Sequence, residues 1–371
     1  MSTSVSKEPL VRIAKREGMP RWQQIGVRIL GLLLSLVICA VVIVTLTGLN
    51  PLEVFKAMYE GAFGTAKRSW VTARDTATLL CIAIGLAPAF AMRFWNIGAE
   101  GQLLVGGIVT VACMKYLSGL PTLLLFVCMI AGSMLIGAIW GFFPGFFKAR
   151  WNTNETLFTL MMNYIALQIT AFMVAVWENP KGAMKVGVVN SSTKAGWIPS
   201  MFSDVPNKDF GWNVALVLFV GVLVYLYLNR SKHGYEISVV GDSVNTARYA
   251  GIRVNNVYIR TMALSGAICG LAGFVAVSGS SHTISTSTAG GRGFTAIIVA
   301  WLAKFNTFTM ILISLLIVFL EKGASQIASN FKLDENIANI LTGIILFFLL
   351  GSEFFCNYRL VFRRNRKNQE A

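Results

Sequence analysis

Apolar residues occupy most of this chain in runs of about 20, separated by short polar connectors. A run of that length matches an α-helix crossing a hydrocarbon core about 30 Å thick. The pattern therefore predicts an all-α integral membrane protein with about ten transmembrane helices, some of them short or interrupted. The expected spans are 26–48, 76–93, 97–117, 121–147, 155–177, 213–229, 257–280, 292–304, 307–328 and 337–356.

Two of these spans are weak. Span 97–117 is rich in glycine, and span 292–304 is too short to cross fully as a helix. They occupy broadly corresponding places in the two halves of the chain, where transporters often build a solute path from interrupted helices. The path is expected near both spans, although two glycine-rich packing helices would give the same pattern.

The distribution of charge sets the expected topology. The 371 residues are 55% apolar and 13% charged, with a mean hydropathy of +0.63 and a net charge of +15. Lys and Arg cluster at the chain ends and in short connectors, which is the positive-inside pattern and does not favour nucleic-acid binding. We expect both termini to be cytoplasmic and membrane lipid to surround the spans. The expected regions are a cytoplasmic tail (1–25), a transmembrane permease domain (26–356) and a basic cytoplasmic tail (357–371), with an external loop (178–212) and a cytoplasmic loop (230–255) inside the domain.

Motifs for chemistry are missing from the sequence. It contains no GxxxxGK[ST] phosphate loop, no HExxH, no GxSxG and no GxGxxG after a strand-like run. It has two histidines, and its six cysteines show no paired spacing. We therefore expect no catalytic residue, no metal site and no cofactor in this chain, and no ATP hydrolysis by the chain alone.

Polar residues inside the membrane are costly and are candidates for function. The densest group runs from Arg93 to Gln102, and its amides, carboxylate and rings could bind ribose hydroxyls and base edges. Equally, Asn96, Glu100 and Gln102 could cap broken helix ends, and Glu100 could pair with Arg93. The candidate pathway residues from this group are Phe94, Trp95, Asn96, Glu100 and Gln102.

Two further polar groups extend the candidate pathway. Thr156, Thr159 and Asn163 share one helix face by their spacing, and that face could line the path or hydrogen-bond to a neighbouring helix. A Ser/Thr-rich stretch, 278–288, leads into the short span. The candidates added here are Thr159, Asn163, Phe294 and Thr295.

The cytoplasmic segment 234–252 has the signals of a short capped helix. Asp242 or Ser243 can N-cap a helix that ends at Ala250, and Gly251 suits the left-handed position that follows. A compact helix between two spans can dock on a soluble partner, whereas an ordinary connector needs neither cap. The candidate docking residues are Glu236, Gly241, Asp242, Ser243, Ala247, Arg248, Ala250 and Gly251.

Glycines repeat every four residues in two spans, at Gly137, Gly141 and Gly145 and at Gly266 and Gly270. Each set makes a smooth stripe that another helix can approach closely. These glycines are expected to serve helix packing.

Four motifs in order resemble the branched-chain amino acid, ribose and nucleoside permease family of bacterial ABC importers. They are Trp95–Gln102, Asn154–Tyr164, Gly234–Ile252 and Gly293–Ala300, and the similarity extends over about residues 76–355. The first motif is similar to that of the nucleoside and simple-sugar branch. Ser238 stands where an arginine is expected, and 242–246 replaces a more acidic, proline-containing stretch.

The resemblance implies a type II ABC importer fold in the bacterial inner membrane. It implies three partners: a second, related permease subunit, an ABC ATP-binding subunit that holds ATP and magnesium, and an extracytoplasmic solute-binding protein. The function expected is import of nucleosides or a related simple sugar, with the ATPase coupled through the 234–252 segment. The alternatives are an ion- or proton-coupled secondary transporter using Glu100 and Arg93, and a membrane enzyme or scaffold.

Overall fold

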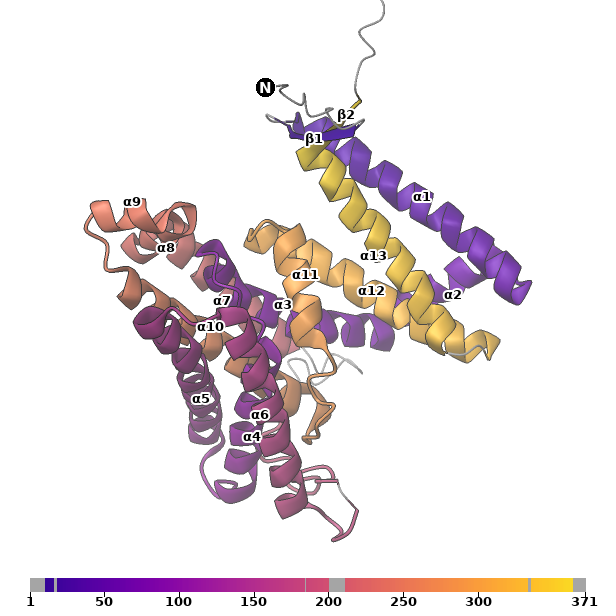
Figure 1. Ribbon diagram of the computed structural model, residues 1–371. Helices are drawn as coiled ribbons and strands as arrows, with labels where there is room; N and C mark the ends of the chain where they lie inside the picture. The colour runs from indigo at the N-terminus through magenta and orange to yellow at the C-terminus, as the bar shows by residue number, and fades with distance from the viewer. Residues whose placement is uncertain (1–10, 17–18, 184, 200–210, 333–334, 363–371) are drawn as a thin grey trace, which may run out of the picture. The chain divides into compact units, whose positions relative to one another are not determined.

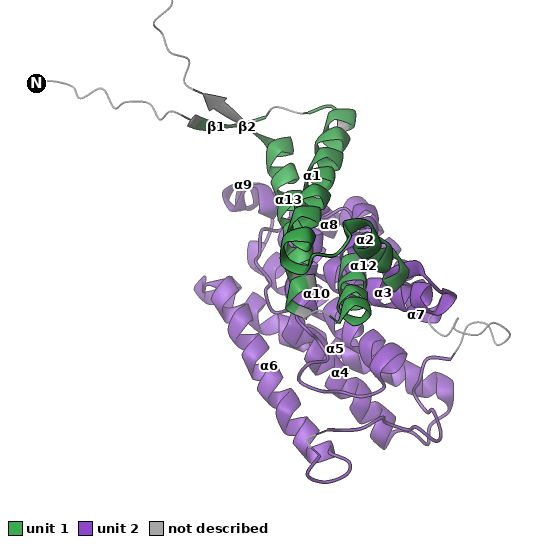
Figure 2. Cartoon of the chain, turned by 90° about the vertical axis from the view of Figure 1, so that its right-hand side faces the viewer, with its two compact units in different colours: residues 1–61, 320–371 green, residues 62–319 purple. Residues whose placement is uncertain are grey.

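The fold was analysed in a computed structural model, which describes residues 11–16, 19–183, 185–199, 211–332 and 335–362. The chain forms two compact units (Figure 2). Unit 1 comprises residues 1–61 and 320–371, and unit 2 comprises residues 62–319. Each unit is described by itself below.

Helices make up most of the described residues (Figure 1). The first half of the chain contains β1 (Val11–Lys15), α1 (Arg21–Thr47), α2 (Pro51–Phe63), α3 (Ala66–Ala91), α4 (Ala99–Tyr116), α5 (Thr122–Trp151) and α6 (Glu155–Trp177). The second half contains α7 (Gly211–Arg230), α8 (Lys232–Asp242), α9 (Val244–Tyr249), α10 (Val254–Ala276), the π-helical turn η1 (Val277–Ser281), α11 (Arg292–Leu302), α12 (Thr307–Phe331), α13 (Glu335–Asn357) and β2 (Tyr358–Phe362).

Within the described residues, eight helices are long and apolar enough to cross a membrane. They correspond to eight of the ten expected spans, and the other two expected spans are α4 and the 11-residue α11. These two are the spans that the sequence marks as weak. The chain is therefore a predominantly helical multi-pass membrane protein, and its described residues form eight candidate full spans together with α4 and the short α11.

Three elements were not expected from the sequence. Helix α2 is only 13 residues long and carries Glu53, Lys56 and Glu60, so it lacks an apolar run. Strands β1 and β2 are each five residues long and lie within the predicted tails. Helix α3 begins at Ala66, ten residues before the predicted start of its span. Its first turns carry basic and polar residues, so they lack the apolar run that predicts a span.

Helix α10 is the centre of unit 2 and packs against α3, α4 and α5. Its glycine stripe meets that of α5: a Cβ added at Gly266 would clash with the carbonyl oxygen of Gly137, and one added at Gly270 with that of Ser133. Close approach of two backbones replaces side-chain burial as the source of packing energy in a membrane. The packing role expected for both stripes is confirmed.

Opposite ends of unit 2 carry its two main connecting segments (Figure 1). Helices α8 and α9 precede α10 at one end. At the other end the 178–199 segment packs on the end of α10, where the amide of Ile198 donates to the carbonyl of Ser278 (3.1 Å). A span of the length of α10 thus separates the segment expected in the cytoplasm from the segment expected outside.

In unit 1, α1 packs against α13, and Arg28 forms an ion pair with Glu353 (2.8 Å). Strands β1 and β2 pair antiparallel, with Ile13 opposite Leu360. The described ends of the chain therefore lie beside one another.

Substituting Gly266 by alanine is expected to destabilise the protein by about 1–3 kcal/mol, because the new Cβ has no room against α5. Gly343→Ala is the matched control, since nothing lies within 4 Å of a Cβ at that position of α13. Thermal unfolding of each purified variant in detergent gives its midpoint for comparison with that of the unsubstituted protein. Equal midpoints for the two variants would contradict the packing role of the stripe.

Candidate functional site

A break in the membrane-buried backbone separates α3 from α4. Residues 92–98 are not helical, and Arg93 adopts a left-handed conformation with φ of 56°. Arg93 and Trp95 are exposed, but Met92, Phe94, Asn96 and Gly98 are buried, so the polar backbone groups there need partners within the protein. The residues that supply these hydrogen-bond partners make up the candidate site.

The first set of partners comes from within the break and from α10. Asn96 is completely buried, and its Oδ1 accepts a hydrogen bond from the amide of Gly98 (3.0 Å). Its Nδ2 lies within hydrogen-bond distance of Ser265 Oγ (3.0 Å) and Gln102 Oε1 (3.3 Å). Asn96 therefore shapes the turn into α4 and ties the turn to the centre of unit 2.

Helix α6 supplies the second set. Asn163 Oδ1 accepts from the amide of Gly101 (2.8 Å), and its Nδ2 donates to the carbonyl of Ile97 (2.8 Å). The hydroxyl of Thr159 accepts from the amide of Ile97 (3.1 Å). The Thr159 and Asn163 face that the spacing predicts thus hydrogen-bonds to the break and to the first turn of α4.

Glu100 links the two short helices. Its Oε1 accepts from the amide of Gly291 (2.9 Å), which immediately precedes α11, and Glu100 itself lies in the first turn of α4. Negative charge is stabilised at helix N-termini. No ion pair between Glu100 and Arg93 occurs among the described residues. Asn96 and Glu100 thus accept from the amides of the residues that precede α4 and α11, whereas Gln102 bonds to Asn96 and the expected ion pair is absent from the part of the chain that the structure describes.

Aromatic rings cover the outer side of the break. The indoles of Trp95 and Trp301 stack at 5.2 Å between centroids and 25° between planes. Phe90 packs edge-on against both of them. Trp95 and Trp301 are 42% and 47% exposed, as is Phe294 at 47%, whereas Asn96 is fully buried. The polar residues therefore hold the break, and the aromatic residues present a surface.

The segment expected in the cytoplasm folds as two short helices. Ser231 N-caps α8, and Ser243 N-caps α9 by accepting from the amide of Thr246 (3.3 Å). At the other end the amide of Gly251, with φ of 76°, donates to Arg248, and that of Ile252 donates to Ala247 (2.9 Å). This is the Schellman pattern. The capped helix expected at 243–250 is confirmed, with α8 as an addition.

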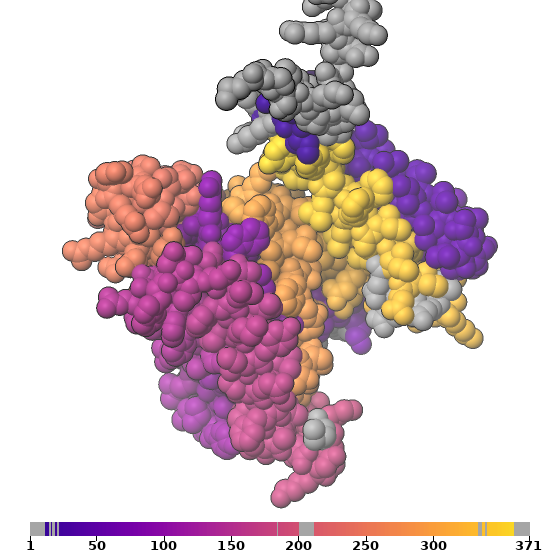
Figure 3. Space-filling model, viewed as in Figure 1, coloured from indigo at the N-terminus to yellow at the C-terminus, as the bar shows by residue number. Residues whose placement is uncertain are grey.

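Only one side of this segment is buried. Ala247 is fully buried, whereas Tyr249 is 93% exposed and its neighbours Arg248 and Ala250 are also exposed. In the space-filling view α8 and α9 project from one end of unit 2 (Figure 3). Glu236 forms an ion pair with Arg260 of α10 (2.9 Å), which fastens α8 to the central helix.

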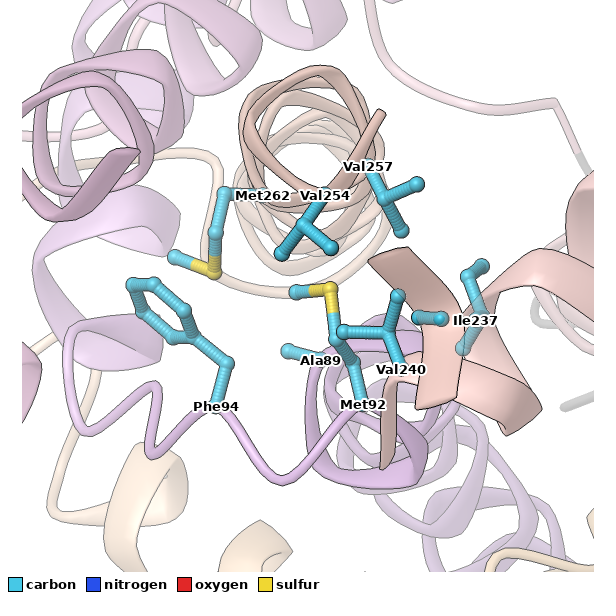
Figure 4. Close-up of a cluster of buried hydrophobic side chains, with 9 residues drawn as sticks. Ala89, Met92, Phe94, Ile237, Val240, Val254, Val257 and Met262 are labelled. Carbon is cyan, nitrogen blue, oxygen red and sulfur yellow. The ribbon is translucent and has the colours of Figure 1, made fainter. Parts of the chain in front are cut away.

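A hydrophobic cluster joins the cytoplasmic segment to the break (Figure 4). Met92 and Phe94 of the break enter it together with side chains of α8, α9 and α10. Gly241 lies so close to the end of α3 that a Cβ there would clash with the carbonyl of Ala91. The members of the cluster are Ala89, Met92, Phe94, Ile237, Val240, Ala247, Val254, Val257 and Met262.

A cavity of about 250 Å³ lies beside this cluster. An ion pair between Lys148 of α5 and Glu155 of α6 (2.9 Å) forms part of its wall. Arg93, Asp242 and Tyr258 line other parts of it. The cavity is thus bounded by the helix break and by residues of α5, α6, α8, α9 and α10.

The predicted pathway residues thus fall into three environments. Phe94 is only 1% exposed and belongs to the hydrophobic cluster, whereas Asn96, Gln102, Thr159 and Asn163 hold the break. Trp95 and Phe294 are on the exposed aromatic surface, and Thr295 Oγ1 donates within α11 to the carbonyl of Gly291 (3.3 Å).

Sequence reasoning missed three contributors to the site: Phe90, Ser265 and Trp301. Trp301 follows Phe294 by seven residues, which places both on one face of a helix. That spacing is a signal that could have been read. Ser265 gives no such signal, because only the fold brings it to Asn96.

These features define a multi-pass membrane protein with a polar-stabilised helix break and, packed against it, two short capped helices. The chain belongs to the family described as the branched-chain amino acid transport system permease component, which it matches over residues 71–350. It is therefore the membrane permease component of a transport system, and its class is that of the ABC permeases.

Relatives with assigned names cover most of the chain. A glucose ABC transporter permease protein of Haloferax volcanii is 26% identical over 97% of this chain and 96% of its own length. A nucleoside ABC transporter permease protein of Lactococcus lactis is 28% identical over 81% of this chain and 84% of its own. A guanosine ABC transporter permease protein of Bacillus subtilis is 28% identical over 84% and 88%.

Replacing Asn163 by leucine is expected to lower the thermal midpoint, because the buried amide of Gly101 and carbonyl of Ile97 each lose their partner, at about 1–3 kcal/mol per group. Gln168→Leu is the control, since this amide side chain is exposed on the same helix. Unfolding in detergent compares the variants. An Asn163→Leu protein as stable as the control would show that the break does not depend on α6.

Proposed function

We propose that this chain is the permease subunit of an ATP-driven importer for nucleosides or a related simple sugar. The relatives named for nucleoside, guanosine and glucose transport support this range of solutes. Solute would move past the exposed rings of Trp95 and Phe294 and past Glu100. The buried amides of Asn96 and Asn163 would hold that surface in place.

The observation that carries the proposal is the packing of the cytoplasmic segment directly on the helix break. Gly241 abuts Ala91, and the side chains of Val240 and Ala247 share one cluster with Phe94. Trp95 follows Phe94 in the chain. A displacement of α8 and α9 that moves Phe94 would therefore also move Trp95 on the aromatic surface. Close-packed interiors transmit such displacements because they have few alternative arrangements.

The partners follow from this function. A separate ABC ATP-binding subunit, holding ATP and magnesium, would receive the exposed side of α9 in the cytoplasm. A second, related permease subunit and an extracytoplasmic solute-binding protein would complete the importer. The complex would lie in the bacterial inner membrane with both termini of this chain in the cytoplasm, where the positive-inside pattern places them.

Secondary transport driven by Glu100 and Arg93 is less well supported. Glu100 is bonded to the amide that precedes α11, and Arg93 lines the cavity next to the cytoplasmic segment. The two residues therefore have separate surroundings. A proton-linked pair would need them in contact.

Gly241→Val tests the coupling. The larger side chain has no room against Ala91, so α8 must move away from the break, and solute-stimulated ATPase activity of the reconstituted complex should fall at least tenfold. Gly119→Val is the control, because nothing lies within 4 Å of a Cβ there. Co-purification of the ATPase shows that the complex still assembles.

Tyr249→Ala separates coupling from folding. This side chain is 93% exposed, so its removal leaves the fold intact and should weaken association with the ATPase. Full stimulation in both Gly241→Val and Tyr249→Ala complexes would contradict the proposed docking.

Uptake by the complete complex in proteoliposomes tests the solute range. The expected result is ATP-dependent accumulation of one or more members of a panel of guanosine, uridine, ribose and glucose, which requires the solute-binding protein. Uphill uptake by the permease without an ATPase would overturn the proposal. An inactive ATPase variant is the control for energy supply.

A further inference from the structure

The exposed face of α11 is aromatic at both ends. Phe294 and Trp301 are each 47% exposed, and they are seven residues apart, so they are on one face about 10 Å from each other. Trp95 extends the Trp301 end by stacking on it. We call these three residues, Trp95, Phe294 and Trp301, the aromatic wall.

The Trp301 end of the wall is rigid. Phe90 is 3% exposed and packs edge-on behind both indoles, and Phe305 stacks on Phe90 (6.1 Å between centroids, 20° between planes). Trp95 is additionally fixed by the break, where its neighbour Asn96 is completely buried. A flat ligand that stacks on this wall would therefore meet rings that are already ordered, which reduces the entropy lost on binding.

The Phe294 end of the wall is polar. Gly293 lies directly against Glu100, and the carboxylate of Glu100 accepts from the amide of Gly291 through one oxygen. The other oxygen, Oε2, is buried and has no hydrogen-bond partner. Next to Gly291, Arg292 pairs with Asp75 at 3.5 Å.

Charged groups at this depth favour a polar path over a lipid-facing surface. Carboxylates and guanidinium groups inside a membrane are placed toward a protein interior or a water-filled path because lipid contact is costly. Glu100 and Arg292 both adjoin the Phe294 end of the wall, so this end is not a purely apolar, lipid-facing surface. The combination of a broad aromatic end and a hydrogen-bonding end suits a solute that is itself flat and apolar at one end and hydroxylated at the other.

We propose that the aromatic wall is the binding surface for the nucleobase of a nucleoside, and that Trp301 determines preference for base-bearing solutes. The base stacks on the outer rings of the Trp95 and Trp301 pair, and the ribose points toward the Phe294 end of the wall, beside Glu100. Stacking of a base on an aromatic side chain is tolerant of base identity. The inference rests on the proposed importer function and narrows its solute range to nucleosides.

The ratio of guanosine to ribose uptake tests the wall, because the two solutes share the sugar and differ in the base. In proteoliposomes with the complete complex, Trp301→Ala should lower the ratio about tenfold or more, and Trp301→Phe should retain most of it. Phe219→Ala is the control, since that ring is 61% exposed on α7, and it should leave the ratio unchanged. An unchanged ratio in Trp301→Ala overturns the proposal. So does a wild-type complex that imports ribose but no nucleoside, and in that case the importer function stands.

Photocrosslinking gives a readout independent of transport. Irradiation of the full complex with 5-iodouridine should label Trp95 or Trp301, as mapped by peptide mass spectrometry, and excess guanosine should suppress the label. Labelling elsewhere, with these two residues unmodified, overturns the wall even if uptake is ATP-driven. Labelling of the two residues in a complex that shows no ATP-driven uptake would support the wall while overturning the proposed importer function. Loss of the second permease subunit from Trp301→Ala complexes would instead identify the wall as a subunit interface and overturn the proposal.

Discussion

The helix break between α3 and α4 depends on one constraint: backbone polar groups inside a membrane must be hydrogen-bonded within the protein. Asn96 and Asn163 meet this constraint, with amide side chains that can donate and accept at the same time. An apolar side chain at either position would leave buried amides and carbonyls without partners. The break is possible because α6 and α10 bring these groups to it.

Several functional features follow from the position of the break. Met92 and Phe94 are part of the cluster that includes α8 and α9. Trp95 meets Trp301 of α11. One short segment of irregular backbone thus contacts both the docking segment and the proposed solute surface. A continuous helix would carry its side chains at fixed 100° intervals and could not face both with adjacent residues.

Helix α11 depends on the same arrangement. It is too short to cross a membrane, and its N-terminus lies beside Glu100. Glu100 supplies one acceptor and a negative charge, which the positive ends of both α4 and α11 stabilise. The carboxylate therefore has a structural role, and its unbonded oxygen remains for a further partner.

The sequence by itself determined the spans, the glycine stripes and the capped helix α9, because each depends on residues near one another in the chain. Apolar runs predict helices, and the caps at Ser243 and Gly251 act within one turn. The four motifs also indicated the family. Helix α2 and the two strands were not predicted, because short elements with charged residues form neither an apolar run nor a capping pattern.

Only the tertiary structure decided what the polar residues do. The spacing of Thr159 and Asn163 predicts a shared face, but the partner of that face is a backbone segment more than 60 residues away in the chain. Likewise, Glu100 finds Gly291 rather than nearby Arg93, and Trp301 joins Trp95 across about 200 residues. Such pairings are set by how the helices pack, and residue spacing within one helix carries no information about which other helix lies beside it.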